Sequence, residues 1–339
     1  MCGVSTQTVS RVINNRPDVS VATRSAVEAA IASVGYQPSA VARSLVQRRS
    51  HTLGVIAAGL QFFGVAQTLN GIAEASETAG YALLLKEVES AERVDILPVI
   101  DFFIGQRVDG IIFAAPDLGG NLSATLPTWS PPMVFLKTAP APNMATIAID
   151  NHGGACLATE HLLALGRRRI AHLAGPLAWR EARDRHDGWR DTLRDAGVEP
   201  GPVVSGNWTS ASGVTAFEQI LAIAPDIDAV FAANDQMALG VLYVAHNLGI
   251  AIPGELAVVG FDGMDEAAQF TPPLTTVVQP LRELGREAVN QLLAAIDEEP
   301  QARGPLRRTL PTQLVIRESA PTPVRERALA GAGSSATPG

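Results

Sequence analysis

Residues 5–14 form the segment of this sequence whose side chains are best suited to chemistry. Val9, Val12 and Ile13 recur at the spacing i, i+3 and i+4, which predicts a helix with one apolar stripe. Such a helix could lie in the major groove of DNA, where polar side chains contact base edges. An ordinary amphipathic surface helix is the alternative. The face opposite the apolar stripe carries the hydrogen-bonding side chains of Thr6, Gln7, Ser10, Arg11 and Asn14.

The charge is distributed unevenly along the 339 residues, whose formal net charge is −8 at pH 7. Residues 1–50 contain six arginines against only Asp18 and Glu28, so this segment is +4 and the remainder is −12. A basic segment on an acidic body is typical of a localised nucleic-acid site, because only the basic segment attracts phosphate. The charge pattern therefore favours DNA binding by the N-terminal segment.

A second helix is predicted after the first, and the sequence shows caps for both. Ser5 and Ser20 each stand at an N-cap, where a side-chain oxygen accepts a hydrogen bond from a backbone N–H group. Gly35 stands where the second helix should end. The buried face of that helix is predicted to consist of Val27, Ala30, Ile31 and Val34.

Three blocks of this segment resemble the DNA-binding headpiece and hinge of the LacI/GalR family of bacterial repressors. The blocks are Val4-Ser-Thr-Gln-Thr-Val-Ser-Arg-Val-Ile-Asn, Val19-Ser-x-x-Thr-Arg and Gly35-Tyr-Gln-Pro-Ser-Ala-Val-Ala-Arg-Ser-Leu. The resemblance implies that Thr6, Gln7 and Arg11 read bases. It implies a hinge helix with Leu45, beside Ala42, wedged into the minor groove. Caps and phosphate contacts are implied for Ser5, Thr8, Ser10, Asn14, Ser20 and Thr23.

Members of this family have a further helix before these blocks, the first half of a helix-turn-helix. The printed sequence begins at the turn. We interpret this as a start assigned about a dozen residues late, which is the length of one helix and its lead-in. A degraded repressor is the alternative.

From Thr52 onward, short apolar runs alternate with helical patterns, which predicts parallel sheets with helical crossovers. Two such sets in tandem, divided near residue 150, predict an α/β protein with two doubly wound subdomains. Ligands bind such folds at the carboxyl ends of the strands. The expected strands include 53–57, 81–85, 109–113, 170–174, 228–232, 256–260 and 313–316.

The core resembles the same family, and its relatives the periplasmic sugar-binding proteins, so that the resemblance covers residues 3–317. The blocks that carry it are Glu160-His-Leu-Leu-Ala-Leu-Gly, Leu173-Ala-Gly-Pro, Arg183-Asp-Arg-His-Asp-Gly-Trp, Ala233-Asn-Asp-Gln-Met-Ala-Leu-Gly, Val259-Gly-Phe-Asp and Pro273-Leu-Thr-Thr-Val. The expected organisation is a helix-turn-helix headpiece (1–38), a hinge helix (39–50), an N-terminal effector subdomain (51–150 plus 281–308), a C-terminal effector subdomain (151–280 plus 309–318) and a disordered tail (319–339).

The resemblance also implies an effector site between the two subdomains. Arg185 matches an arginine that grips hydroxyls or a carboxylate, for which a guanidinium fork is well suited. Lys137 departs from the acidic or small polar group frequent there, and would indicate a phosphate or uronate ligand if it faces the cleft. The other implied effector contacts are Phe62, Trp208, Asn234, Asp262 and Gln279.

Each of these residues also has a purely structural interpretation. Trp208 could belong to the core, and Asp262 could simply form a turn. Arg185 could pair with Asp187 or Glu181 on the surface. Phe62 and Gln279 could likewise have either a structural or a ligand-binding role. The sequence therefore leaves the effector unidentified.

Composition and motifs exclude several other classes of protein. No run of eighteen apolar residues and no secretory signal pattern is visible, and Cys2 and Cys156 stand alone, which fits a cytoplasmic protein. No dinucleotide, phosphate-loop or nucleophile-elbow motif occurs, so we expect no enzyme, no catalytic residue and no cofactor. No metal site is expected among His51, His152, His161, His172, His186 and His246.

The sequence therefore predicts a homodimeric repressor that binds palindromic operator DNA and a small-molecule effector, a sugar or sugar derivative. A dimer is expected because one headpiece reads only half of a palindromic site. A cytoplasmic sugar-binding protein that has lost DNA binding is the alternative.

Overall fold

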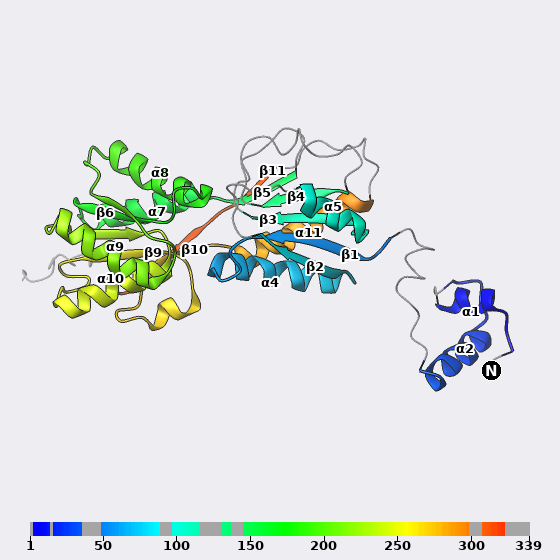
Figure 1. Ribbon diagram of the computed structural model, residues 1–339. Coiled ribbons are helices and arrows are strands. Elements are labelled where there is room, and N and C mark those ends of the chain that lie inside the picture. The colour runs from blue at the N-terminus through cyan, green and yellow to red at the C-terminus, as the bar shows by residue number, and fades with distance from the viewer. Residues whose placement is uncertain are drawn as a thin grey trace, which may run out of the picture.

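The computed structural model describes residues 3–13, 16–35, 49–88, 97–115, 131–136, 145–297 and 307–322. Two α/β subdomains, each built on a six-stranded sheet, lie side by side, and two helices form the N-terminal headpiece (Figure 1). This architecture confirms the predicted fold class. Within the described ranges, no helix has the length and apolar character needed to cross a membrane.

The headpiece consists of α1 (Thr6–Ile13) and α2 (Val21–Ser33), and both predicted N-caps are confirmed. The Ser5 hydroxyl accepts a hydrogen bond of 3.2 Å from the backbone N–H three residues on, and the Ser20 hydroxyl does the same at 3.2 Å. Gly35 follows α2 with a φ of 59°, the left-handed conformation predicted for this helix end.

The two headpiece helices are joined through a small apolar contact and one arginine. Val12 and Val27 are buried, and the Arg24 guanidinium donates to the Val12 carbonyl at 3.4 Å. The prediction that Val34 is buried is wrong, since its side chain is 74% exposed. Val34 lies two turns beyond Val27, about 10 Å further along the helix axis, and therefore past the contact with the short helix α1.

The N-terminal subdomain has the strand order β11-β5-β4-β3-β1-β2, and all of its strand pairs are parallel. Alternate residues of β1 enter different cores: Leu53 and Val55 pack with α4 and α11, and Ile56 packs with α5. Helices therefore cover both faces of the sheet. The elements are β1 (Thr52–Ala57), α4 (Phe63–Thr78), β2 (Ala82–Glu87), α5 (Leu97–Gly105), β3 (Gly110–Ala114), β4 (Met133–Leu136), β5 (Ala145–Ile149), α11 (Leu281–Asp297) and β11 (Arg307–Leu310).

The C-terminal subdomain repeats this plan with the order β12-β10-β9-β8-β6-β7, in which only the edge strand β12 is antiparallel. Val230 packs on the side of α9 and α10, and its neighbour Phe231 packs with residues of α7 and α8. The elements are α7 (Asn151–Ala164), β6 (Ile170–Ala174), α8 (Arg180–Asp195), β7 (Val203–Ser205), α9 (Ser210–Ile223), β8 (Ala229–Ala232), α10 (Asp235–Leu248), β9 (Ala257–Asp262), the 3-10 helix η1 (Asp265–Gln269), β10 (Thr275–Val278) and β12 (Gln313–Val315).

The described chain passes between the subdomains at three places: from β5 to α7, from β10 to α11, and from β11 to β12 (Figure 1). The expected boundary between residues 308 and 309 falls inside β11, which pairs along its whole length with β5. The third crossing is therefore at residues 311–312, because the strand continues until its last backbone pairing.

The expectation that residues 319–339 form a disordered tail is wrong for its first residues. Ser319 and Ala320 are fully buried. The Ser319 hydroxyl donates to the Val258 carbonyl at 2.6 Å and accepts from the Thr275 N–H at 2.8 Å. A small polar side chain that satisfies buried backbone groups is ordered despite the low apolar content around it. Residues 323–339 lie outside the described residues.

Helices α4 and α11 cross closely at two glycines, and an added methyl group there should be costly. A Cβ at Gly71 would lie 2.1 Å from the Arg282 carbonyl oxygen, and one at Gly285 would lie 2.2 Å from the Thr68 carbonyl oxygen. We expect Gly71→Ala to lower the free energy of unfolding by about 1–3 kcal/mol, because the obstacle is backbone. Urea denaturation measures the change.

The matched control is Gly105→Ala at the end of α5, where an added Cβ meets nothing within 4 Å. The control should unfold at the urea concentration of the unmodified protein. Equal urea midpoints for the two variants would show that α4 and α11 can move apart without lowering the free energy of unfolding.

Candidate ligand pocket

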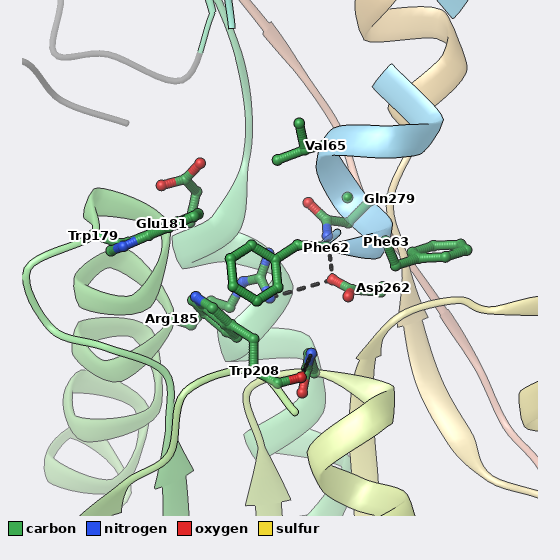
Figure 2. Close-up of a pocket in the computed structure, with 11 residues that line it drawn as sticks. Phe62, Phe63, Val65, Trp179, Glu181, Arg185, Trp208, Asp262 and Gln279 are labelled. Atoms are coloured by element: carbon green, nitrogen blue, oxygen red, sulfur yellow. Dashed lines mark hydrogen bonds and ion pairs between the residues drawn. The ribbon is translucent and has the colours of Figure 1, made fainter. Parts of the chain in front are cut away.

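A pocket lies where the two subdomains meet (Figure 2). Most of its residues stand at the carboxyl ends of parallel strands or at helix N-termini, the usual ligand position in doubly wound folds. The structure thus brings together six of the seven predicted effector residues, while Lys137 lies outside the described residues. The lining consists of Phe62, Phe63, Gly64, Val65, Trp179, Glu181, Arg185, Trp208, Asn234, Asp262 and Gln279.

Arg185 of α8 lies at the base of the pocket and is only 4% exposed. Its Nη1 lies 3.3 Å from Asp262 Oδ1, and its Nε donates to Asn151 Oδ1 at 2.8 Å. The guanidinium stacks 3.9 Å from the centre of the Phe261 ring. Burial lowers the pKa of Arg185, and the Asp262 carboxylate opposes that shift. The alternative of a surface ion pair with Asp187 is wrong.

Asp262, at the end of β9, connects Arg185 to the second crossing between the subdomains. Its Oδ1 accepts a hydrogen bond of 2.6 Å from Gln279 Nε2, in addition to the contact with Arg185 (Figure 2). Asp262 has a φ of 116°, a conformation that side chains rarely adopt. Gln279 follows β10 directly, and Asn151 begins α7 directly after the first crossing. One hydrogen-bonded network therefore reaches the first and second of the three crossings from the pocket.

Trp208 and Asn234 are coupled in the wall formed by the C-terminal subdomain. The Asn234 amide donates to the Trp208 carbonyl at 2.9 Å, and its Oδ1 caps α10 by accepting from the Met237 N–H at 2.9 Å. Asn234 therefore holds the loop that carries Trp208, which has a φ of 73°. The Trp208 ring covers Gly175, where a Cβ would lie 2.1 Å from it. Trp208 is buried and lines the pocket, so it serves both as core and as pocket wall.

Trp179 and Glu181 belong to the lining residues that were not predicted, together with Phe63, Gly64 and Val65. The Trp179 ring meets Phe62 of the other subdomain edge-on, with centroids 5.5 Å apart, and lies 6.0 Å from the Trp208 ring. Glu181 stands in the first turn of α8 and is 6% exposed. Their position in the sequence could have indicated them, because Trp179 and Glu181 follow the predicted strand 170–174, and this fold places ligand contacts after its strands.

Asp235, which was also not predicted, is fully buried behind Asp262 in the first turn of α10. Thr276 Oγ1 donates to its Oδ1 at 2.5 Å, and the Met264 N–H donates to its Oδ2 at 2.8 Å. Burial first, and then the nearby Asp262 carboxylate, raise the pKa of Asp235 from 3.8 to about 7. A carboxyl group that changes charge near neutral pH thus stands next to the pocket.

In the headpiece, the predicted base-reading side chains lie on one exposed face of α1. Thr6, Gln7 and Arg11 are exposed, whereas Val12 on the other face is buried. Arg11 Nη1 lies 3.4 Å from the exposed carboxylate of Asp18. The Thr8 and Thr23 hydroxyls bond to their capping serines. Asn14, Ala42 and Leu45 lie outside the described residues. In the described ranges, no cluster of three or more potential ligands could hold a metal ion.

A two-lobed α/β core with a pocket between its lobes, preceded by a small helical headpiece, defines a ligand-responsive regulator. Residues 1–39 match the profile described as bacterial regulatory proteins, lacI family, and residues 159–320 match a periplasmic binding protein-like domain. The chain belongs to the lacI family of bacterial regulatory proteins and is a transcriptional repressor.

Relatives of the same family match nearly the whole chain. The HTH-type transcriptional regulator CelR of Thermobifida fusca is 36% identical over 94% of this chain and 96% of its own length. The lactose operon repressor of Escherichia coli is 33% identical over 95% of this chain and 89% of its own. The structure of the lac repressor dimer bound to operator and an anti-inducer aligns with a TM-score of 0.86, at 33% identity, over 94% of this chain and 96% of that one. A CelR–cellobiose complex aligns with a TM-score of 0.70, at 34% identity, over 94% and 97%.

Proposed function

We propose that this repressor is a homodimer that binds a palindromic operator in the cytoplasm and is controlled by a sugar or sugar derivative in the pocket. The observation that carries this proposal is the network of Arg185, Asp262 and Gln279, which joins the pocket to the crossings between the subdomains. A ligand that takes hydrogen bonds from this network changes the forces on the crossings. It thereby biases the relative orientation of the two lobes, which is a coupling free energy between two sites rather than catalysis.

Exposed apolar side chains support the proposed dimer. Leu83 and Leu85 are 36% and 45% exposed on β2, which ends its sheet on one side. In the C-terminal subdomain, Leu239 and Tyr243 of α10 are 39% and 59% exposed. In a dimer whose interface includes both subdomains, a second subunit would cover these apolar side chains.

The proposal is tested by fluorescence anisotropy of a labelled duplex from upstream of the gene, titrated with protein at several salt concentrations. We expect specific, strongly salt-dependent binding that a sugar added to the protein shifts. Sugar binding without any DNA binding would instead support the alternative of a binding protein that has lost its DNA site.

Arg11→Ala tests the DNA-reading face of α1 directly. The variant should lose about 1–3 kcal/mol of operator binding and should tolerate other bases at one operator position. The measurement is the dissociation constant on the operator and on duplexes with single base changes. Arg194→Ala is the control, because Arg194 is an exposed arginine of α8 that pairs with Asp191 and Asp195 in the core domain. A loss of equal size on all duplexes would make Arg11 a phosphate contact.

A further inference from the structure

The chain is held tightly at the point where it enters the core, directly before β1. The carboxylate of Asp109 accepts three hydrogen bonds there: from the Ser50 N–H at 2.8 Å, from the Ser50 hydroxyl at 3.0 Å and from the His51 N–H at 2.8 Å. The His51 carbonyl accepts from the Ala82 N–H at 2.8 Å. These contacts hold His51 at a φ of 51°, which side chains rarely adopt. One carboxylate thus fixes two consecutive residues at the entry to the core.

Arg49 makes a further contact from the same segment. Its Nη1 donates to Asp297 Oδ1 at 2.7 Å, and its Nη2 donates to the Ile296 carbonyl at 3.1 Å. Asp297 is the last residue of α11, so the guanidinium lies at a helix C-terminus, where the helix dipole favours a positive charge. We name these contacts the linker anchor, which consists of Arg49, Ser50, His51, Asp109 and Asp297.

Helix α11 connects the linker anchor to the pocket. Gln279 lines the pocket, donates to Asp262, and lies two residues before the helix, where its carbonyl accepts from the Leu281 N–H at 2.9 Å. The 17 residues from Leu281 to Asp297 span about 25 Å. In Figure 1, β1 begins at the end of its sheet that lies away from the C-terminal subdomain. The helix therefore runs from the second crossing to the place where the chain enters the core.

Packing makes α11 one body with the N-terminal subdomain. Leu284, Val289 and Leu292 are fully buried in the core that β1 and α4 share. Closely packed interiors transmit a displacement rather than absorb it. A change in the orientation of the subdomain at Gln279 is therefore carried to the position of Arg49.

We propose that Asp109 and Asp297 are positioning residues for DNA binding. They hold the segment that leads to the headpiece on the N-terminal subdomain, so that the orientation of the lobes set at the pocket determines how the headpiece is presented to the operator. Neither residue lines the pocket, and both act through residues 49–51. This inference rests on the proposed function, because it assigns the residues through which the pocket controls DNA binding.

A double-mutant cycle on operator affinity, measured without any effector, tests the inference by anisotropy on the upstream duplex. Gln279→Ala removes the hydrogen bond to Asp262 and should change the operator dissociation constant about fivefold or more. Asp109→Ala and Asp297→Ala together remove the acidic partners of residues 49–51. In that background, Gln279→Ala should leave the dissociation constant unchanged within about twofold.

Two results would overturn the role of the linker anchor. The first is a change by the same factor, within about twofold, when Gln279→Ala is made with and without the anchor, because distant sites that are independent have additive effects. The second is a Gln279→Ala protein that binds the operator as the unmodified protein does.

Two further variants exclude a loss of structure as the cause. The Asp297 side chain is 67% exposed, and exposed ion pairs contribute little to stability, so Asp297→Ala should keep the urea midpoint of the unmodified protein. This single variant should already reduce the effect of Gln279→Ala on operator affinity. Asp297→Glu retains the carboxylate and should retain the full effect.

Glu287→Ala is the matched control, because Glu287 is an acidic residue of α11 that pairs with Arg308 and stands at neither end of the helix. Gln279→Ala should have its full effect in this background. A reduction as large as that in the Asp297→Ala background would overturn the assignment, since any lost ion pair of α11 would then act alike.

The unmodified protein in the same titration separates this inference from the proposed function. No specific binding to the duplex would overturn the proposed function, and this inference with it. Specific binding in which Gln279→Ala acts equally with and without the linker anchor would overturn the anchor alone and leave the repressor function in place.

Discussion

Arg185→Ala is expected to lower the free energy of unfolding by about 3–5 kcal/mol and to abolish the response of operator binding to the effector. The alanine would leave the buried Asp262 carboxylate without its ion-pair partner and would remove the hydrogen bond to Asn151. It would also expose the faces of Phe261 and Trp208 on which the guanidinium stacks. Urea denaturation measures the stability, and anisotropy with and without sugar measures the response.

Two further variants separate the loss of stability from the loss of signalling. Arg185→Lys keeps the charge but not the planar fork, so it should remain folded and respond weakly. Arg194→Ala on the exposed side of α8 should change neither property. A normal effector response in a folded Arg185→Lys protein would show that the guanidinium geometry has no part in the coupling.

The buried carboxyl of Asp235 is expected to make the protein less stable as the pH rises. Its pKa is about 7 in the folded protein against an ordinary value of 3.8, so the folded state binds this proton more tightly. The resulting stabilisation is complete below about pH 4 and is lost as the pH rises through 7. Between pH 5 and pH 8 this group should remove about 2–3 kcal/mol of unfolding free energy.

Asp235→Asn isolates this contribution, because the amide can still accept from the Met264 N–H and can donate to Thr276 Oγ1. Unfolding of the two proteins is compared by urea titration at pH 5, 6, 7 and 8. The difference between them should grow with pH in favour of the asparagine variant. A constant difference across this range would mean that Asp235 keeps one charge state throughout.

The sequence predicted many of the apolar, buried strands, but the expected strands did not include β4, β5 and β10, which are short and mostly buried inside their sheets. The expected strand 170–174 coincides with β6, whose five residues are all buried. The prediction omitted β11, because Arg307-Arg-Thr-Leu is a polar edge strand with three exposed residues. It also omitted β7, which has three residues and lies at the opposite edge of its sheet. Edge strands lack the apolar signal that burial on both faces imposes.

The pocket could be predicted only in part. Resemblance placed Arg185, Trp208 and Asp262 correctly at the pocket, but gave no indication of Glu181 or Asp235. The environment of Asp235 depends on contacts between distant segments, since Asp235 meets Thr276 across 41 positions of sequence. Such contacts follow from the packed fold rather than from any local pattern. Asn234 was predicted as a ligand contact, but both ends of its side-chain amide bond within the protein. The amide nitrogen donates to the Trp208 carbonyl, and the amide oxygen caps α10.

The three crossings also constrain how the protein is made. The first sheet contains β5, which ends at Ile149, but its edge strand β11 is synthesised only at residues 307–310. The second sheet needs β12, and its buried Ser319 comes later still. Domains generally fold one after another during synthesis, but here neither lobe has all of its strands until residues 307–315 have been synthesised. From the synthesis of β5 until that of β11, the growing chain therefore carries an unpaired edge of its first sheet.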